Sequence, residues 1–171
     1  MTDEPAMTGE PAVIRAMAIT VSNRAAAGVY EDKSGPVLVA MLEDLGCQVD
    51  GPVVVPDGEP VADVLRDAVA DGYDVVVTSG GTGLTPTDQT PEMTRQVIEW
   101  EIPGIAEAVR LEGREAVPAA ILSRGLAGVA GGTLIVNLPG STGGVRDGMT
   151  VLGRVLVHAV DQIRGGDHPR P

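Results

Sequence analysis

Two aspartates and one run of glycines are the residues of this sequence whose types and spacing best suit chemistry. The run Gly80-Gly81-Thr82-Gly83 follows a short apolar stretch, and Asp88 comes just before Thr90-Pro91-Glu92. Glycines permit positive φ angles and a close approach of a ligand to the backbone, so their N–H groups and the Thr82 hydroxyl form a candidate anion-binding nest. A glycine-rich turn alone is weak evidence, because such turns also simply connect strands to helices.

Asp57 ends a second apolar stretch, and Asp88 is expected to be presented by the loop rather than to cap the following helix. Two carboxylates near an anion nest would repel a phosphate. A hard cation such as Mg²⁺ resolves this conflict, because it takes carboxylate oxygens on one side and phosphate oxygens on the other. The alternative for each aspartate is an ordinary loop residue that accepts hydrogen bonds from turn amides.

A third polar cluster, Pro139-Gly140-Ser141, precedes the last helical segment and offers further amides at the positive end of a helix dipole. Plain helix capping is its alternative role. Three arginines, Arg24, Arg124 and Arg146, are possible phosphate contacts, although a surface ion pair is the ordinary role of each. The sequence shows no Ser-His-Asp set, zincin motif or dinucleotide fingerprint.

Composition predicts one domain whose core is aliphatic. The chain has 171 residues, of which 43% are hydrophobic but only 2% aromatic, with no Phe. We expect a disordered leader over residues 1–11, a single α/β domain over 12–164 and a flexible tail over 165–171.

Charge and cysteine content exclude several classes of protein. A net charge of −12 argues against a nucleic-acid partner. No apolar run approaches the roughly 20 residues that span a bilayer, so no membrane association is expected. The single cysteine, Cys47, excludes an internal disulfide, and the cytoplasm is the simplest location. The single lysine, Lys33, lies in no phosphate-loop motif.

Strand-like and helix-like segments alternate along the chain, which predicts a mainly parallel sheet with helices on both faces. Strands are expected at 13–21, 47–56 (irregular near Gly51-Pro52), 73–78, just before a Gly-Gly turn, and 133–138. Helices are expected from Ser34 to about Gly46, from about 61 to 72, from Thr90 through Ile98, over 105–111, and as one long helix from Ser141 or Thr142 to Ile163.

The alternation also predicts where a ligand would bind. In open parallel sheets, ligands occupy the edge beyond the carboxyl ends of the strands. Four polar clusters follow strand segments and should therefore meet there: 22–24, 56–58, 79–83 and 139–141.

At these residues the sequence resembles the molybdopterin adenylyltransferase (Mog/MoaB) family of molybdenum cofactor biosynthesis. The resemblance covers about Val13 to Ile163, and its most specific element is TSGGTGLTPTDQTPE. Further matching stretches occur in the same order along the chain: TVSNR, YEDKSGP, VPD, IPGIAEAVR, LSR followed by LAGV, and TLIVNLPGS.

The resemblance implies a three-layer, MogA-like molybdopterin-binding fold and Mg²⁺- and ATP-dependent transfer of AMP to the phosphate of molybdopterin, with release of pyrophosphate. It implies a homotrimer or dimer of trimers, and delivery of the product to a molybdenum-insertion protein. Asp57 and Asp88 match the family's critical acidic positions and are the candidate Mg²⁺ ligands. The implied substrate-binding residues are Gly80, Gly81, Thr82, Gly83, Pro139, Gly140 and Ser141, with Asp32, Ser34 and Glu107 at positions of less defined role.

The sequence departs from the family pattern at Asn23, where many members have Asp, and GSTGG after Pro139 is closer to the MoaB branch. A second reading is therefore a molybdopterin-binding or scaffold protein without turnover. A third is a regulatory partner that acts through its acidic surface. Retention of Asp57 and Asp88 favours the enzyme.

Overall fold

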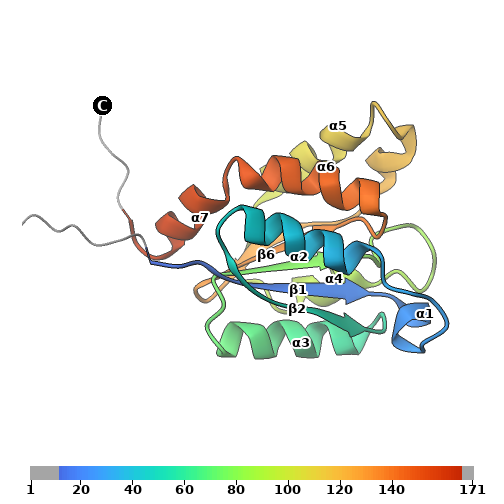
Figure 1. Cartoon of the computed structure of the whole chain (residues 1–171), viewed down its shortest axis with the longest axis horizontal. Coiled ribbons are helices and arrows are strands. Elements are labelled where there is room, and N and C mark those ends of the chain that lie inside the picture. Colours follow the sequence, from blue (N-terminus) through green and yellow to red (C-terminus); the bar gives the residue numbers. More distant parts are fainter. Residues whose placement is uncertain (1–11, 167–171) are drawn as a thin grey trace, which may run out of the picture.

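A six-stranded sheet forms the centre of this computed structural model, which describes residues 12–166 (Figure 1). The strand order is β2-β1-β3-β6-β5-β4. The first four strands in this order are parallel, and β5 and β4 are antiparallel to their neighbours. The bounds are β1 Arg15–Val21, β2 Gln48–Val55, β3 Val75–Ser79, β4 Trp100–Glu101, β5 Ala127–Ala130 and β6 Thr133–Leu138.

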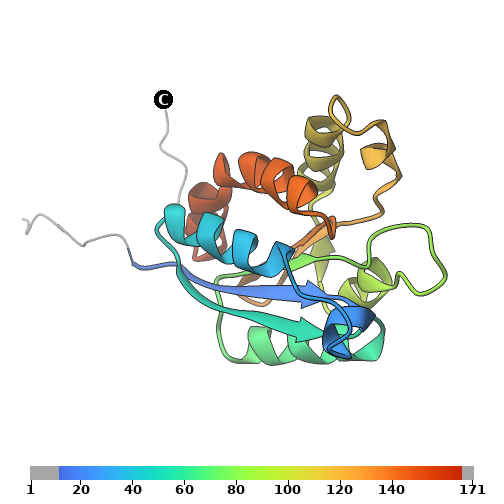
Figure 2. The same cartoon turned by 45° about the vertical axis from the view of Figure 1, so that its right-hand side comes forward.

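Helices cover both faces of this sheet and make a three-layer α/β fold, as predicted (Figures 1 and 2). Four helices, α2, α5, α6 and α7, lie on one face, and α3 and α4 lie on the other. The bounds are α1 Asn23–Ala26, α2 Ser34–Asp44, α3 Glu59–Ala70, α4 Thr90–Arg95, α5 Pro103–Gly113, the 3₁₀ helix η1 Pro118–Leu122, α6 Thr142–Gly153 and α7 Leu156–Ile163. None of the helices within residues 12–166 is both long and apolar enough to cross a membrane.

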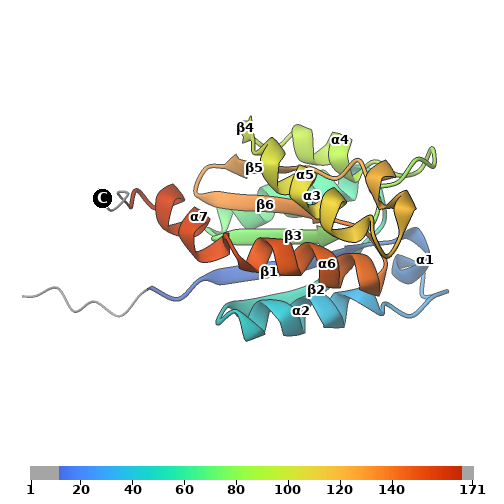
Figure 3. The ribbon, with the colours of Figure 1, turned by 90° about the horizontal axis from the view of Figure 1, so that it is seen from above.

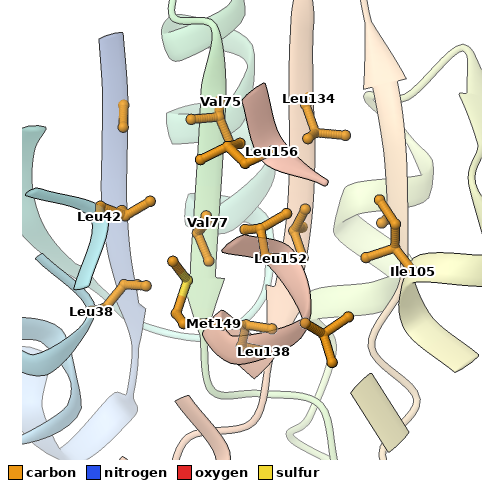
Figure 4. Close-up of a cluster of buried hydrophobic side chains, with 14 of the residues drawn as sticks. Leu38, Leu42, Val75, Val77, Ile105, Leu134, Leu138, Met149, Leu152 and Leu156 are labelled. Carbon is orange, nitrogen blue, oxygen red and sulfur yellow. The ribbon is translucent and has the colours of Figure 1, made fainter. Parts of the chain in front are cut away.

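The larger core lies between the sheet and α2, α5, α6 and α7. Figure 3 shows these helices lying over one face of the sheet. Leu38 and Leu42 of α2 and Leu152 of α6 pack on Val75 and Val77 of β3 (Figure 4). The smaller core on the other face joins α3 and α4 to β1, β3 and β6. Aliphatic side chains fill most of both cores, as the scarcity of aromatic residues requires.

The irregularity expected at Gly51-Pro52 is present. The peptide bond between these residues is cis, and the β1–β2 register shifts between Met17 and Ile19. Gly51 has a φ of 118°, and a Cβ built there would lie 2.5 Å from the carbonyl oxygen of Ala18. Only glycine fits this close contact between β1 and β2.

The prediction of one long C-terminal helix was wrong, because α6 ends at Gly153 and α7 begins at Leu156. Between them, the amides of Arg154 and Val155 donate to carbonyls three residues back, which tightens the last turn. Leu152 and Leu156 are both fully buried in the same core. The apolar spacing therefore continues across a break in the backbone hydrogen bonding.

The α4 prediction was too long, and three short elements, α1, β4 and η1, were not predicted. Helix α4 ends at Arg95, so Val97 and Ile98 pack against the smaller core from non-helical backbone that leads into β4. The edge strand β4 carries Trp100, whose side chain is 57% exposed. Helix α1, capped by the Ser22 hydroxyl, occupies part of the expected loop after β1. The expected leader 1–11 and residues 167–171 of the expected tail lie outside the described residues.

The core assignment predicts a large effect at Leu152 and a small one at Val157. Leu152→Ala should lower the free energy of unfolding by about 2–5 kcal/mol, because it leaves a cavity at a fully buried position. Val157→Ala on α7, where the side chain is 60% exposed, should change it by less than about 0.5 kcal/mol. Urea unfolding of both variants checks this; equal losses would contradict the assignment.

Candidate functional site

A cavity of about 650 Å³ lies at the carboxyl ends of the parallel strands. It brings together residues of all four polar clusters that follow strand segments in the sequence, as the parallel topology predicted. Its lining includes Thr20, Ser22, Asn23, Arg24, Tyr30, Asp32, Lys33, Ser34, Asp57, Ser79, Gly80, Gly81, Thr87, Asp88, Gly140, Ser141 and Thr142.

A second cavity of about 800 Å³ lies on the other side of the glycine loop and has a more apolar wall. Its wall is built from α5, η1 and the start of α6, together with Thr82, Gly83 and Pro139. The two cavities share Gly80, Gly81, Asp88, Gly140 and Ser141. These shared residues form a ridge at which groups bound on the two sides would meet.

The backbone at this ridge is packed so closely that it requires glycine. Gly80 has a φ of 103°, and a Cβ built there would lie 2.2 Å from the carbonyl oxygen of Val21. A Cβ on Gly140 would lie 3.2 Å from the Cα of Gly80. The chain after β6 thus lies directly against the chain after β3, which puts the two loops in contact.

Three amides of the glycine loop are available to a ligand. Within the described residues, the N–H groups of Gly81, Thr82 and Gly83 donate no hydrogen bond to the protein. Gly81 also has a positive φ of 65°, as an anion-binding nest requires. The base of the loop is fixed by Thr90, whose N–H donates to the Gly81 carbonyl and whose hydroxyl donates to the Gly80 carbonyl. Thr90 is the first residue of α4, where the helix was expected to begin, and Gln89 occupies the cap position.

Asp57 is half-buried and uses one carboxylate oxygen, Oδ1, to hold two backbone amides. Gly58 N–H and Gln89 N–H donate to it at 2.9 and 2.8 Å. Burial raises the pKa of Asp57, and the charges of Asp88 and Glu92 raise it further, against the lowering effect of the two hydrogen bonds. The Asp57 amide itself donates to the Asn23 side-chain oxygen at 2.9 Å.

Asp88 is held by its own loop. The Thr85 N–H and hydroxyl donate to Oδ2 of Asp88 at 3.0 and 2.7 Å, and the Asp88 N–H donates to the Thr85 carbonyl. Within residues 12–166, both side-chain hydrogen bonds of Asp88 involve Oδ2. Oδ1 of Asp88 and Oδ2 of Asp57 are thus the carboxylate oxygens left for a ligand in the 650 Å³ cavity, which both residues line.

The rest of the cavity wall supplies positive potential in a chain of net charge −12. The first residues of α2 and α6, Ser34 and Thr142, line it, so the positive ends of two helix dipoles lie at its edge. Lys33 and Arg24 also line it, and the Arg24 guanidinium lies 5.4 Å from the ring centre of Tyr30. A small anion is therefore favoured locally even though the whole molecule is acidic.

Asp32 and Ser34 form a polar network at the floor of the cavity. Asp32 Oδ2 accepts from the Thr20 hydroxyl at 2.9 Å, and Oδ1 accepts from Gly35 N–H at 2.9 Å. Ser34 shares a hydrogen bond of 2.8 Å with the buried Ser79 hydroxyl at the end of β3. The Gly35 N–H in the first turn of α2 thus has the Asp32 carboxylate as its acceptor, while Lys33 occupies the cap position without a side-chain capping bond.

One predicted residue is not brought to the site, and several lining residues were not predicted. Glu107 is exposed on α5 because that helix turns Ile105, Ala106 and Val109 inward, and it lines neither cavity. The cavity is also lined by Thr20, Tyr30, Lys33 and Thr87, none of which was predicted as a site residue. All four lie in stretches that resemble the family, TVSNR, YEDKSGP and TSGGTGLTPTDQTPE, and this resemblance is the signal that could have found them.

Asp57 and Asp88 suit a Mg²⁺ ion that is bound together with a substrate better than a metal ion whose ligands all come from the protein. No group of three or more His, Cys, Asp or Glu side chains that could hold a metal occurs among residues 12–166. Mg²⁺ is commonly bound by one or two carboxylates together with substrate phosphates and water, and the two aspartates each have one oxygen left over. The donor set therefore fits a Mg²⁺ ion that arrives with a phosphate ligand.

Comparison with known proteins identifies the same region of the chain. Residues 17–159 match a protein family described as a probable molybdopterin binding domain. A molybdopterin adenylyltransferase of Helicobacter pylori strain J99 is 35% identical over 154 residues, which cover 86% of each chain. A molybdenum cofactor biosynthesis bifunctional protein of Synechococcus elongatus is 36% identical over 95% of this chain but 51% of its own length. The chain thus spans about half the length of the first curated relatives it matches.

The fold is also that of a solved relative. A molybdopterin biosynthesis Mog protein from Mycobacterium ulcerans is 53% identical, with a TM-score of 0.85 over 88% of this chain and 99% of the other. This similarity confirms the predicted MogA-like fold.

The raised pKa of Asp57 predicts how stability depends on pH. Because the folded protein keeps the Asp57 proton to a higher pH than the unfolded chain, the contribution of this group is fully present below about pH 4 and is lost as the pH rises through the folded pKa. Asp57→Asn keeps an oxygen for the two amides but has no charge to desolvate. In metal-free buffer the variant should therefore gain stability relative to wild type between pH 4 and pH 7, measured by urea unfolding. A constant difference over this range would contradict the raised pKa.

The tight ridge predicts that Gly80 does not accept a side chain. Gly80→Ala should lower the free energy of unfolding by at least about 2 kcal/mol, because it combines a positive φ with a clash against the Val21 carbonyl. Gly143→Ala is the matched control, since a Cβ there meets nothing within 4 Å, and it should change stability by less than about 1 kcal/mol. Thermal unfolding compares the two; equal effects would refute the close packing.

Proposed function

This chain belongs to the molybdopterin-binding domain family of molybdenum cofactor biosynthesis, and we propose that it is a molybdopterin adenylyltransferase. It would transfer AMP from ATP to the terminal phosphate of molybdopterin and release pyrophosphate. The H. pylori relative carries this activity in its name and is covered over most of its length, which supports the proposal.

One observation carries the proposal: Asp88 and the free Gly81 amide lie on the ridge shared by the two cavities, with Asp57 in one cavity and the free amides of Thr82 and Gly83 in the other. A transfer between two substrates needs both reacting groups at one place. The volumes of about 650 and 800 Å³ fall in the range of small-molecule sites, and their contact at the ridge suits two ligands that react there.

The chemistry requires positioning and charge neutralisation more than proton transfer. A phosphate monoester has a second pKa of about 6, so its oxygen is already a nucleophile at neutral pH. It attacks the α-phosphorus of ATP, the bond from that phosphorus to the bridging oxygen breaks, and pyrophosphate leaves with the electron pair. Because no proton moves, a site without a histidine base is sufficient, and alignment of the two anions supplies much of the rate.

Residues at the ridge and on either side of it have defined roles in this proposal. The N–H groups of Gly81, Thr82 and Gly83 and the positive end of α6 at Ser141 bind phosphate oxygens. Asp57 and Asp88 would hold Mg²⁺, which supplies neutralisation of charge on the transferred phosphoryl group. The positive ends of α2 and α6 and the side chains of Arg24 and Lys33 draw the anionic substrates toward the cavity.

We also propose a cellular location, an oligomeric state and a downstream partner for this enzyme. We expect a cytoplasmic homotrimer or dimer of trimers that passes adenylylated molybdopterin to a molybdenum-insertion protein. A second candidate, a molybdopterin-binding scaffold without turnover, is favoured by the MoaB-like GSTGG sequence and predicts binding without pyrophosphate release.

Pyrophosphate release from purified protein, given molybdopterin, ATP and Mg²⁺, tests the proposal. Asp88→Asn should lower kcat/KM by about 100-fold or more, because it removes a charge from the site of phosphoryl transfer. Asp63→Asn is the matched control, since Asp63 forms an exposed i,i+3 pair with Arg66, and it should retain wild-type turnover.

Two outcomes would overturn parts of the proposal. Wild-type turnover in Asp88→Asn would remove Asp88 from the reaction. A folded wild-type protein that binds molybdopterin and releases no pyrophosphate would replace the enzyme with the scaffold.

A further inference from the structure

Arg124 lies behind the glycine loop and not in the 650 Å³ cavity. It follows η1, far from the loop in sequence, and the residues that line either of the two functional cavities do not include it. Its side chain is 35% exposed and contacts the outer side of the loop. Of the three arginines considered as phosphate contacts, Arg124 is therefore the one that the fold directs away from the phosphates.

The guanidinium of Arg124 uses all of its nitrogen atoms on the loop and the helix that follows it. Nε donates to the Gly83 carbonyl at 2.9 Å, and one terminal nitrogen donates to the Asp88 carbonyl at 2.7 Å. The other terminal nitrogen pairs with the carboxylate of Glu92 in the first turn of α4. The Arg124 backbone N–H adds a bond of 2.8 Å to the Thr82 carbonyl.

These contacts join the two ends of one short segment. Gly83 lies at the start of the loop and Asp88 near its end, so a single rigid fork fixes the distance between them. A Cβ on Gly83 would lie 2.8 Å from Oδ2 of Asp88, which shows how closely the two ends meet. Thr85 fixes the Asp88 carboxylate, and Arg124 fixes the Asp88 backbone.

Glu92 makes this clamp electrically neutral. The hydrogen bond from Arg124 lowers the pKa of Glu92, which favours the ionised carboxylate. The pair leaves the loop without an added net charge beside Asp57 and Asp88. Lysine cannot replace the arginine, because one ammonium cannot reach three acceptors arranged along a plane.

We propose that Arg124 is a positioning residue that closes the 80–89 loop and thereby sets the place of Asp88 in the site. The catalytic consequence rests on the proposed adenylyltransferase function, whereas the clamp itself does not. Loss of the clamp leaves Asp88 in the chain but on a loosened loop.

The first test is amide hydrogen exchange of full-length protein, read on peptides that cover residues 80–92. Arg124→Ala and Arg124→Lys should each raise exchange of this segment by about tenfold or more, because hydrogen bonds from a charged donor are lost. Arg95→Ala is the matched control: Arg95 lies in the last turn of α4 and pairs with Glu101 on the surface, so loop exchange should stay unchanged.

The second test is kinetic and separates positioning from general stability. In Arg124→Ala and Arg124→Lys, kcat should fall by about 10- to 100-fold and the half-saturating Mg²⁺ concentration should rise, while Arg95→Ala keeps wild-type values. Added guanidinium should restore part of the kcat of Arg124→Ala and none in Arg95→Ala.

Each outcome decides the proposal. Wild-type loop exchange in both Arg124 variants would show that there is no clamp. Raised exchange with wild-type kcat and Mg²⁺ dependence would show a purely structural role and overturn the positioning role. If wild-type protein releases no pyrophosphate, the proposed function has failed, and the exchange comparison still decides whether Arg124 holds the loop.

Discussion

The close contact between the backbones that leave β1, β3 and β6 is the constraint on which the rest of the site depends. Gly80 fits between the carbonyl of Val21 and the backbone of Gly140, where no larger residue has room. This contact fixes where the glycine loop begins and where α6 begins. The free amides, the two aspartates and the two cavities all take their places from it.

The site contains two aspartates although its proposed ligands are anions. Positive groups of the protein offset part of this negative charge. Helix ends and the few basic side chains at the cavity provide positive potential from the protein. Burial raises the pKa of Asp57, and the charges of Asp88 and Glu92 raise it further, so a nearby cation would favour the ionised form of this carboxylate. Behind the loop, the ion pair between Arg124 and Glu92 carries no net charge, so the protein balances these two charges itself.

The sequence was sufficient for those features that depend on periodicity and topology. Alternating segments indicated a mainly parallel sheet, and that topology alone placed Asp57, the glycine run and Gly140 at one edge. It was insufficient where tertiary contacts decide. The spacing of Leu152 and Leu156 is the same in one helix as in two, and the end of α4 at Arg95 depends on the pairing of β4 with β5. The exposure of Glu107 and the contact of Arg124 with the outer side of the glycine loop depend on packing that no local pattern contains.

Trp100 on the edge strand β4 has a practical consequence for spectroscopy of this protein. It is the single tryptophan of the chain, it is more than half exposed, and it lines neither cavity described above. Its fluorescence therefore reports mainly on solvent access to the β4 edge. A change in emission that depends on protein concentration would mark burial of this edge by another molecule. Ligand entry into either cavity, which Trp100 does not line, would leave the emission largely unchanged.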